Sequence, residues 1–125
     1  MALRWGTADA ERVITDHGVW LALAEGEAIE FAAKTVRDMV IFTDRRLVVT
    51  DTQGVLHKKT EYLSVPYRAV GRWSVESRGR GMGNRFDGAD LKIWLGAAVE
   101  PLLNIELQKD ESAQEVMALL SKHAM

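Results

Sequence analysis

The spacing of apolar residues changes twice along this chain of 125 residues. From Asp9 onward apolar side chains recur every three or four residues, which predicts a helix. We expect that helix to end near Gly18, because glycine inside a helix costs about 1 kcal/mol. After Glu25-Gly26-Glu27 the spacing becomes two, which is the period of a strand with one buried face. A helical spacing returns near the end of the chain.

The middle stretch predicts about seven short strands separated by polar or glycine-containing turns. Their expected spans are 29–34, 37–43, 46–50, 57–65, 70–77, 90–95 and 103–107. The second of these spans is almost continuously apolar, which is typical of a strand covered on both faces. We expect Pro66 to end the fourth strand, because proline cannot donate to a hydrogen-bonded ladder.

The last stretch predicts an amphipathic helix. Ser112 stands three residues before Glu115, which is the spacing of a capping box at a helix start. Val116, Leu119 and Leu120 then form one apolar stripe, which we expect to pack against the sheet. Strands followed by one such helix indicate a mainly β domain: a sandwich or partly open barrel capped by the C-terminal helix, after a short N-terminal helix.

Several short motifs cover most of the chain in a fixed order, from about Gly26 to the last helix. They are Arg37-Asp38, Phe42-Thr43-Asp44-Arg45-Arg46-Leu47, Asp51-Thr52-Gln53-Gly54, Lys58-Lys59, Tyr62-Leu63-Ser64-Val65-Pro66-Tyr67, Trp73-Ser74-Val75-Glu76 and Asp90-Leu91-Lys92-Ile93-Trp94. Their order and spacing resemble the bacterial pleckstrin-homology (PH) domain family. The resemblance implies a seven-stranded bent sandwich closed by a C-terminal helix. Residues 1–25 would then be an N-terminal helical extension and residues 26–125 the PH-like domain.

Composition excludes several classes of protein. The chain has no cysteine, which excludes disulfide scaffolds, zinc ribbons and cysteine nucleophiles. Sixteen Lys and Arg against eighteen Asp and Glu give a net charge of −2, which argues against a protein that coats nucleic acid or anionic lipid. The longest apolar run is far shorter than the roughly 20 residues of a membrane-spanning helix. The charged N-terminal segment does not look like a signal peptide, so we expect a cytoplasmic protein.

No pattern of catalytic or metal-binding residues is visible. His17, His57 and His123 lie on different predicted elements, and none has a second ligand at the spacing of a metal motif. The serines lack the G-x-S-x-G elbow of a hydrolase nucleophile. We therefore expect no catalytic residue, no metal, no cofactor and no enzyme.

Five basic residues are candidate ligand-binding residues. A glycine-rich connection without acidic residues contains Arg78, Arg80 and Arg85, whose guanidinium groups could bind phosphate. The alternative interpretation is a hairpin loop whose charges are solvated. PH domains that bind inositol phosphates use basic residues on the first two strands and the loop between them, which here correspond to Lys34 and Arg37. Because the turn is short and offers only these two cations, we do not assign inositol-phosphate binding to this chain. Arg37 could instead pair with an acidic neighbour. A weak binder of phosphate, lipid headgroups or nucleic acid is the alternative function, although neither membrane lipid nor nucleic acid is an expected partner.

Aromatic residues point to contacts between chains. Four tryptophans are more than a small core readily holds, and aromatic side chains are enriched in protein interfaces. Trp94 alternates out of phase with Leu91 and Ile93, so it should face outward beside Lys92. Two interpretations stay open: Trp94 and Lys92 lie in an interface, or the chain's own N-terminal helix covers Trp94.

The resemblance also implies ring-like homo-oligomers whose neighbours are joined through strand edges, and a pentameric ring is one candidate. The leading hypothesis is therefore a non-enzymatic binding and assembly module. It self-associates and presents a surface to a protein or peptide partner.

Overall fold

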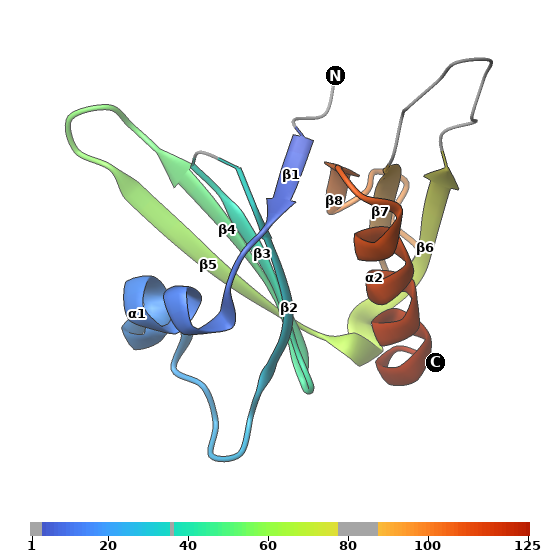
Figure 1. Cartoon of the computed structure of the whole chain (residues 1–125), viewed down its shortest axis with the longest axis horizontal. Helices are drawn as coiled ribbons and strands as arrows, with labels where there is room; N and C mark the ends of the chain where they lie inside the picture. Colours follow the sequence, from blue (N-terminus) through green and yellow to red (C-terminus); the bar gives the residue numbers. More distant parts are fainter. Residues whose placement is uncertain (1–3, 36, 78–87) are drawn as a thin grey trace. The chain divides into compact units, whose positions relative to one another are not determined.

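The computed structural model describes residues 4–35, 37–77 and 88–125, and for residues 4–6 it describes the backbone alone. The chain forms two compact units: one runs from Thr7 to Tyr67, and the other combines the N-terminal strand with the chain from Arg68 onward. Each unit holds a sheet and one helix (Figure 1). The mainly β architecture with a short N-terminal helix and a C-terminal helix is confirmed.

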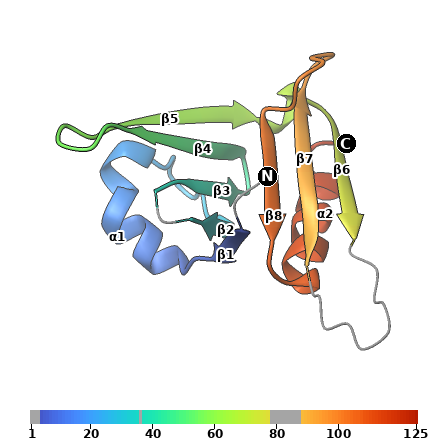
Figure 2. The same cartoon turned by 90° about the horizontal axis from the view of Figure 1, so that it is seen from above.

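The unit from Thr7 to Tyr67 is a four-stranded antiparallel sheet with one helix on it. Its strands follow one another in the order β2-β3-β4-β5. Figure 2 shows the helix lying along this sheet. The elements are α1 (Ala10–Leu21), β2 (Ile29–Lys34), β3 (Met39–Thr43), β4 (Arg46–Gln53) and β5 (Lys59–Pro66). Pro66 is the last residue of β5, as expected.

Both faces of this sheet carry buried apolar side chains. On one face Val13 and Leu21 of α1 pack in a single cluster with the strand residues Ala32, Met39, Ile41 and Val48. Every residue of β3 is buried, including Val40 and Phe42, which alternate with the cluster residues. The continuously apolar sequence of β3 therefore reflects burial on both faces, as the spacing predicted.

The first helix is longer than the sequence predicted. It begins after Asp9, whose carboxylate accepts the Glu11 N–H, and it continues through Gly18 to Leu21. Leu21 is 2% exposed, and burying a leucine stabilises the fold by about 1.5–3 kcal/mol, more than a glycine costs in a helix. The predicted end at Gly18 was wrong because this tertiary burial outweighs helix propensity. The helix ends at Ala22, which adopts a left-handed conformation with φ 47°.

The second unit is a mostly antiparallel sheet covered by the C-terminal helix. Neighbouring strands follow the order β1-β8-β7-β6; β8 pairs with β7 and β7 with β6 in antiparallel register, and β1 pairs with β8 in parallel. A 3₁₀ turn, η1 (Tyr67–Ala69), precedes β6. The elements are β1 (Arg4–Thr7), β6 (Val70–Ser77), β7 (Ala89–Leu95), β8 (Leu103–Leu107) and α2 (Asp110–His123). The strand β1 is an addition to the predicted set.

The C-terminal helix buries the predicted stripe, since Val116 and Leu120 are fully buried and Leu119 nearly so. Its start differs from the prediction. The helix begins at Asp110 after Lys109, which makes no side-chain cap, and Ser112 is buried within the first turn. The predicted capping box was wrong because Asp110 and Glu111 already place negative charge on the first turn, which favours an earlier start. Asp110 also accepts the Gly88 N–H at 2.8 Å, which ties the helix start to the beginning of β7.

Candidate functional site

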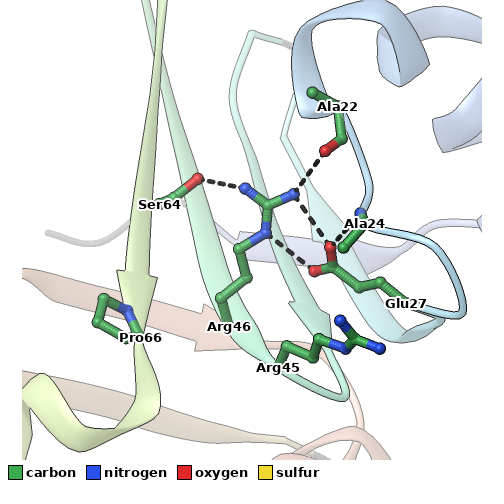
Figure 3. A pocket seen from close by; sticks show the side chains of 7 residues that line it. All are labelled: Ala22, Ala24, Glu27, Arg45, Arg46, Ser64 and Pro66. Carbon is green, nitrogen blue, oxygen red and sulfur yellow. Dashed lines mark hydrogen bonds and ion pairs between the residues drawn. The ribbon is translucent and has the colours of Figure 1, made fainter.

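A pocket of about 390 Å³ opens where the C-terminal end of α1 meets the sheet of its unit (Figure 3). We call it the Glu27–Arg46 pocket, after the ion pair in its wall. Its lining comes from the α1–β2 connection, the start of β4 and the end of β5. The lining residues are Ala22, Ala24, Glu27, Arg45, Arg46, Ser64 and Pro66.

The Arg46 guanidinium connects three segments of the chain across this pocket. Its Nε donates to Glu27 Oε2 at 2.9 Å, and its Nη1 donates to Ser64 Oγ at 2.7 Å on β5. Its Nη2 donates to the Leu21 carbonyl at 2.7 Å and to Glu27 Oε1 at 3.2 Å. Figure 3 shows the guanidinium between Glu27, Ser64 and the carbonyl of Ala22. Because α1 has no basic residue in its last turn, Arg46 supplies the positive charge that stabilises the carbonyl end of a helix.

The Glu27 carboxylate is ionised at neutral pH. Its side chain is only 2% exposed, and burial alone would raise its pKa. Hydrogen bonds from Arg46, the Ala24 N–H and Thr43 Oγ1, together with the positive charge of Arg46, outweigh burial and lower the pKa to about 2. A carboxylate held in this way does not exchange protons near neutral pH, so it serves as a fixed charge rather than a general acid or base.

The outer edge of β5 forms one border of the pocket. β5 pairs with β4 along its whole length and stands at an end of the strand order. Six of its eight residues are exposed, whereas Tyr62 is half-buried and Val65 is buried. Alternate residues of such a strand direct N–H and C=O groups away from their neighbour, where another chain can pair with them. We call this feature the β5 edge.

An aromatic pair, one ring exposed and the other half-buried, flanks the β5 edge on the side of α1. Trp20 is 70% exposed, and its ring stacks on Tyr62 with centroids 6.4 Å apart and planes 20° apart. The Tyr62 hydroxyl lies 2.8 Å from Nδ1 of His17, which fixes the tyrosine ring against the helix. Tyr62 and Ser64 are two residues apart on β5, so their side chains share one face of the sheet. The aromatic pair and the Glu27–Arg46 pocket are therefore neighbours along the β5 edge.

The candidate ligand-binding residues on the first hairpin have different neighbours. Lys34 ends β2 and lines a hollow beside the start of α1, together with Arg12 and Thr15. Arg37 donates from Nη2 to the Gly54 carbonyl in the β4–β5 connection, rather than to an acidic side chain. A ligand-binding role for these two cations stays a prediction. Arg78, Arg80 and Arg85 lie outside the described residues.

The two candidate interface residues share the outer face of β7. Leu91 and Ile93 are fully buried, while Lys92 and Trp94 alternate with them and are half-buried. The Trp94 Nε1 donates to the Val99 carbonyl at 3.1 Å, and the Arg72 guanidinium lies 4.4 Å from the ring centroid. Trp94 thus has partners in its own unit, and its place in an interface stays a prediction.

Neither Glu27 nor Arg46 was a candidate site residue from the sequence. The strands β2 and β3 with their turns lie between the two residues in the chain, and no local spacing marks them as a pair. Within the described residues no group of three or more His, Asp or Glu side chains is placed to hold a metal ion. The helices of the described ranges are all too short or too polar to cross a bilayer.

Comparison with known proteins gives consistent matches over nearly the whole chain. The model of a family described as the bacterial PH domain matches residues 3–124. The uncharacterized protein YjqA of Bacillus subtilis is 43% identical over 104 residues, which are 82% of this chain and 79% of that protein.

Two crystal structures share the fold. A Shewanella loihica protein with a pleckstrin-homology domain superimposes with a TM-score of 0.76 at 27% identity, covering 98% of each chain. A pleckstrin homology domain from Shewanella amazonensis superimposes with a TM-score of 0.64 at 30% identity, covering 94% of this chain and 90% of that one.

Proposed function

Because the chain belongs to the bacterial PH domain family, we propose that it is a non-enzymatic module that works by contact with other protein chains. Copies of it self-associate through strand edges into a ring-like homo-oligomer, and the assembled copies present a surface to a protein or peptide partner. The β5 edge is the observation that carries this proposal.

The β5 edge has the properties of a pairing surface. Soluble proteins normally protect an edge strand with lysine, proline, a bulge or a short length. In β5, Lys59 and Pro66 stand at the two ends, and the six residues between them pair with β4 in continuous register. The sheet of the second unit also ends in a strand of eight residues, β6. Two unlike edges on one chain permit head-to-tail pairing, which closes a ring when the rotation between copies allows it.

The ionised Glu27 supports a role in contact rather than catalysis. Its carboxylate is committed to Arg46, and its pKa of about 2 removes it from acid–base chemistry near neutral pH. The stable ion pair instead holds α1, β4 and β5 together beneath the β5 edge. A rigid support of this kind favours pairing, because less conformational entropy is lost when another strand is added.

Leu63→Lys tests the proposal by placing a charge on the middle of the β5 edge. Leu63 is 38% exposed, so the lysine side chain can reach solvent in the free chain. We expect sedimentation velocity to show a smaller species than the wild type, because an edge lysine would be crowded by a paired strand. Val19→Lys, at a position 86% exposed on α1, is the matched control and should sediment like the wild type. A Leu63→Lys variant with the wild-type assembly would contradict pairing through β5.

A further inference from the structure

We propose that the β5 edge also recognises an extended segment of another protein in which an apolar residue and an acidic residue stand two positions apart. This inference rests on the proposed function and names the chemistry of the partner. The apolar side chain would lie on the aromatic pair, and the acidic side chain would enter the Glu27–Arg46 pocket.

The first recognition element is the open backbone of β5. A segment that pairs with β5 continues the β4–β5 ladder, in which Thr50 faces Tyr62 and Val48 faces Ser64. Its side chains then fall alternately on the two faces of the sheet, and side chains two residues apart are about 7 Å apart on the same face. The two partner side chains that lie beside Tyr62 and Ser64 therefore belong to residues two positions apart in the partner segment.

The second element is the exposed ring of Trp20. The Trp20 side chain is 70% exposed and stacks on the half-buried Tyr62, so the pair offers an apolar surface next to the strand edge. The hydrogen bond between Tyr62 and His17 holds the Tyr62 ring in place in the absence of a partner. Covering an exposed aromatic ring with an apolar side chain stabilises a complex by removing apolar area from water.

The third element is a pair of hydrogen-bond donors at the mouth of the pocket. Ser64 Oγ accepts from Arg46, so its own proton is available to an acceptor. The Arg46 guanidinium has five N–H groups, and Nη1 carries two of them. One Nη1 N–H donates to Ser64, and the other has no acceptor among the described residues. The wall of the pocket carries two positive side chains, Arg45 and Arg46, against one negative, Glu27. Two donors and a net positive wall fit the carboxylate of an aspartate or glutamate.

Fluorescence anisotropy with the full chain and a labelled peptide tests this inference. The probe is Thr-Val-Glu-Thr-Leu-Thr-Glu-Val, which places an acid two positions to either side of leucine and so fits β5 in both strand directions. Changing both glutamates to glutamine should weaken binding about tenfold, because a charge-assisted hydrogen bond is lost. Changing the leucine to serine should weaken it about fivefold or more, because the apolar contact is lost. These comparisons use one folded protein, so misfolding does not affect them.

Variants of the chain locate the binding site. Trp20→Ser should weaken binding of the wild-type peptide about fivefold or more and abolish the effect of the leucine change. Val19→Ser, at the neighbouring exposed position on α1, is the matched control and should leave binding unchanged. Binding that is equal for the glutamate and glutamine peptides, or equal for Trp20→Ser and the wild type, would overturn the inference.

Native mass spectrometry separates this inference from self-association. Because a second copy and the peptide would use the same edge, the wild-type peptide should lower the population of oligomer, and the glutamine peptide should lower it less. A chain that is monomeric without peptide, yet discriminates between the two peptides, would refute self-association while supporting peptide recognition. A chain that forms an oligomer but discriminates between none of the peptides would refute peptide recognition alone.

Discussion

Glu27→Gln removes the negative charge that holds Arg46 at the end of α1. The pKa of Glu27 is lowered from its ordinary value of 4.5 to about 2, and one pKa unit corresponds to about 1.36 kcal/mol. The ionised carboxylate therefore contributes about 3 kcal/mol to the free energy of unfolding at pH 7. Because glutamine keeps part of the hydrogen bonding, we expect Glu27→Gln to lose about 2–3 kcal/mol.

The pH dependence has a definite sign. The pKa is lower in the folded chain than in the unfolded chain, so the stabilisation is complete above about pH 4.5 and is lost as the pH falls toward 2. The difference in free energy of unfolding between the wild type and Glu27→Gln should shrink over that range. Urea denaturation followed by circular dichroism at several pH values measures this difference.

Glu25→Gln is the matched control, because Glu25 is an exposed glutamate in the same connection. Its free energy of unfolding should stay within about 0.5 kcal/mol of the wild type at pH 7. If Glu27→Gln were as stable as Glu25→Gln at pH 7, the assignment of Glu27 as a stabilising ion-pair partner would be refuted. A wild-type advantage that did not change below pH 4.5 would refute the lowered pKa.

Three further substitutions test the packing and the turn geometry. Gly71→Ala should lower the free energy of unfolding by about 2 kcal/mol or more in urea denaturation, because its Cβ would lie 1.8 Å from the carbonyl oxygen of Gly96. Ala22→Gly should raise the thermal midpoint and stabilise the chain by about 0.5–1 kcal/mol, because Ala22 is exposed and has a positive φ. Tyr67→Phe should cost about 1–2 kcal/mol in the same denaturation assay, because the buried Thr43 carbonyl loses the hydroxyl that donates to it at 2.6 Å.

The strands β7 and β8 were predictable because burial alternates along them. In β8, Leu103, Ile105 and Leu107 are buried while the residues between them are not, so the period of two is visible in the sequence. The strand β1 has only four residues, which is too short for a period to show. The end of α1 was mispredicted because Leu21 gains its stability from contacts with distant strands, which local propensity does not report.

The pocket was not predictable from the sequence because its parts meet only after the sheet has formed. Arg46 donates hydrogen bonds to Leu21, which precedes it in the chain, and to Ser64, which follows it. No periodic spacing links these three positions. The exposure of Trp20 was also not predictable from the sequence. Trp20 belongs to the longest apolar run of the sequence, yet Val13 and Leu21 occupy the buried face of α1 and leave its ring in solvent.

Native mass spectrometry of the full wild-type chain at micromolar concentration is the most direct test of the central claim. We predict a closed homo-oligomer as the main species, with Leu63→Lys shifted toward the monomer and Val19→Lys unchanged. A wild-type chain that is only monomeric under these conditions would contradict assembly through the β5 edge.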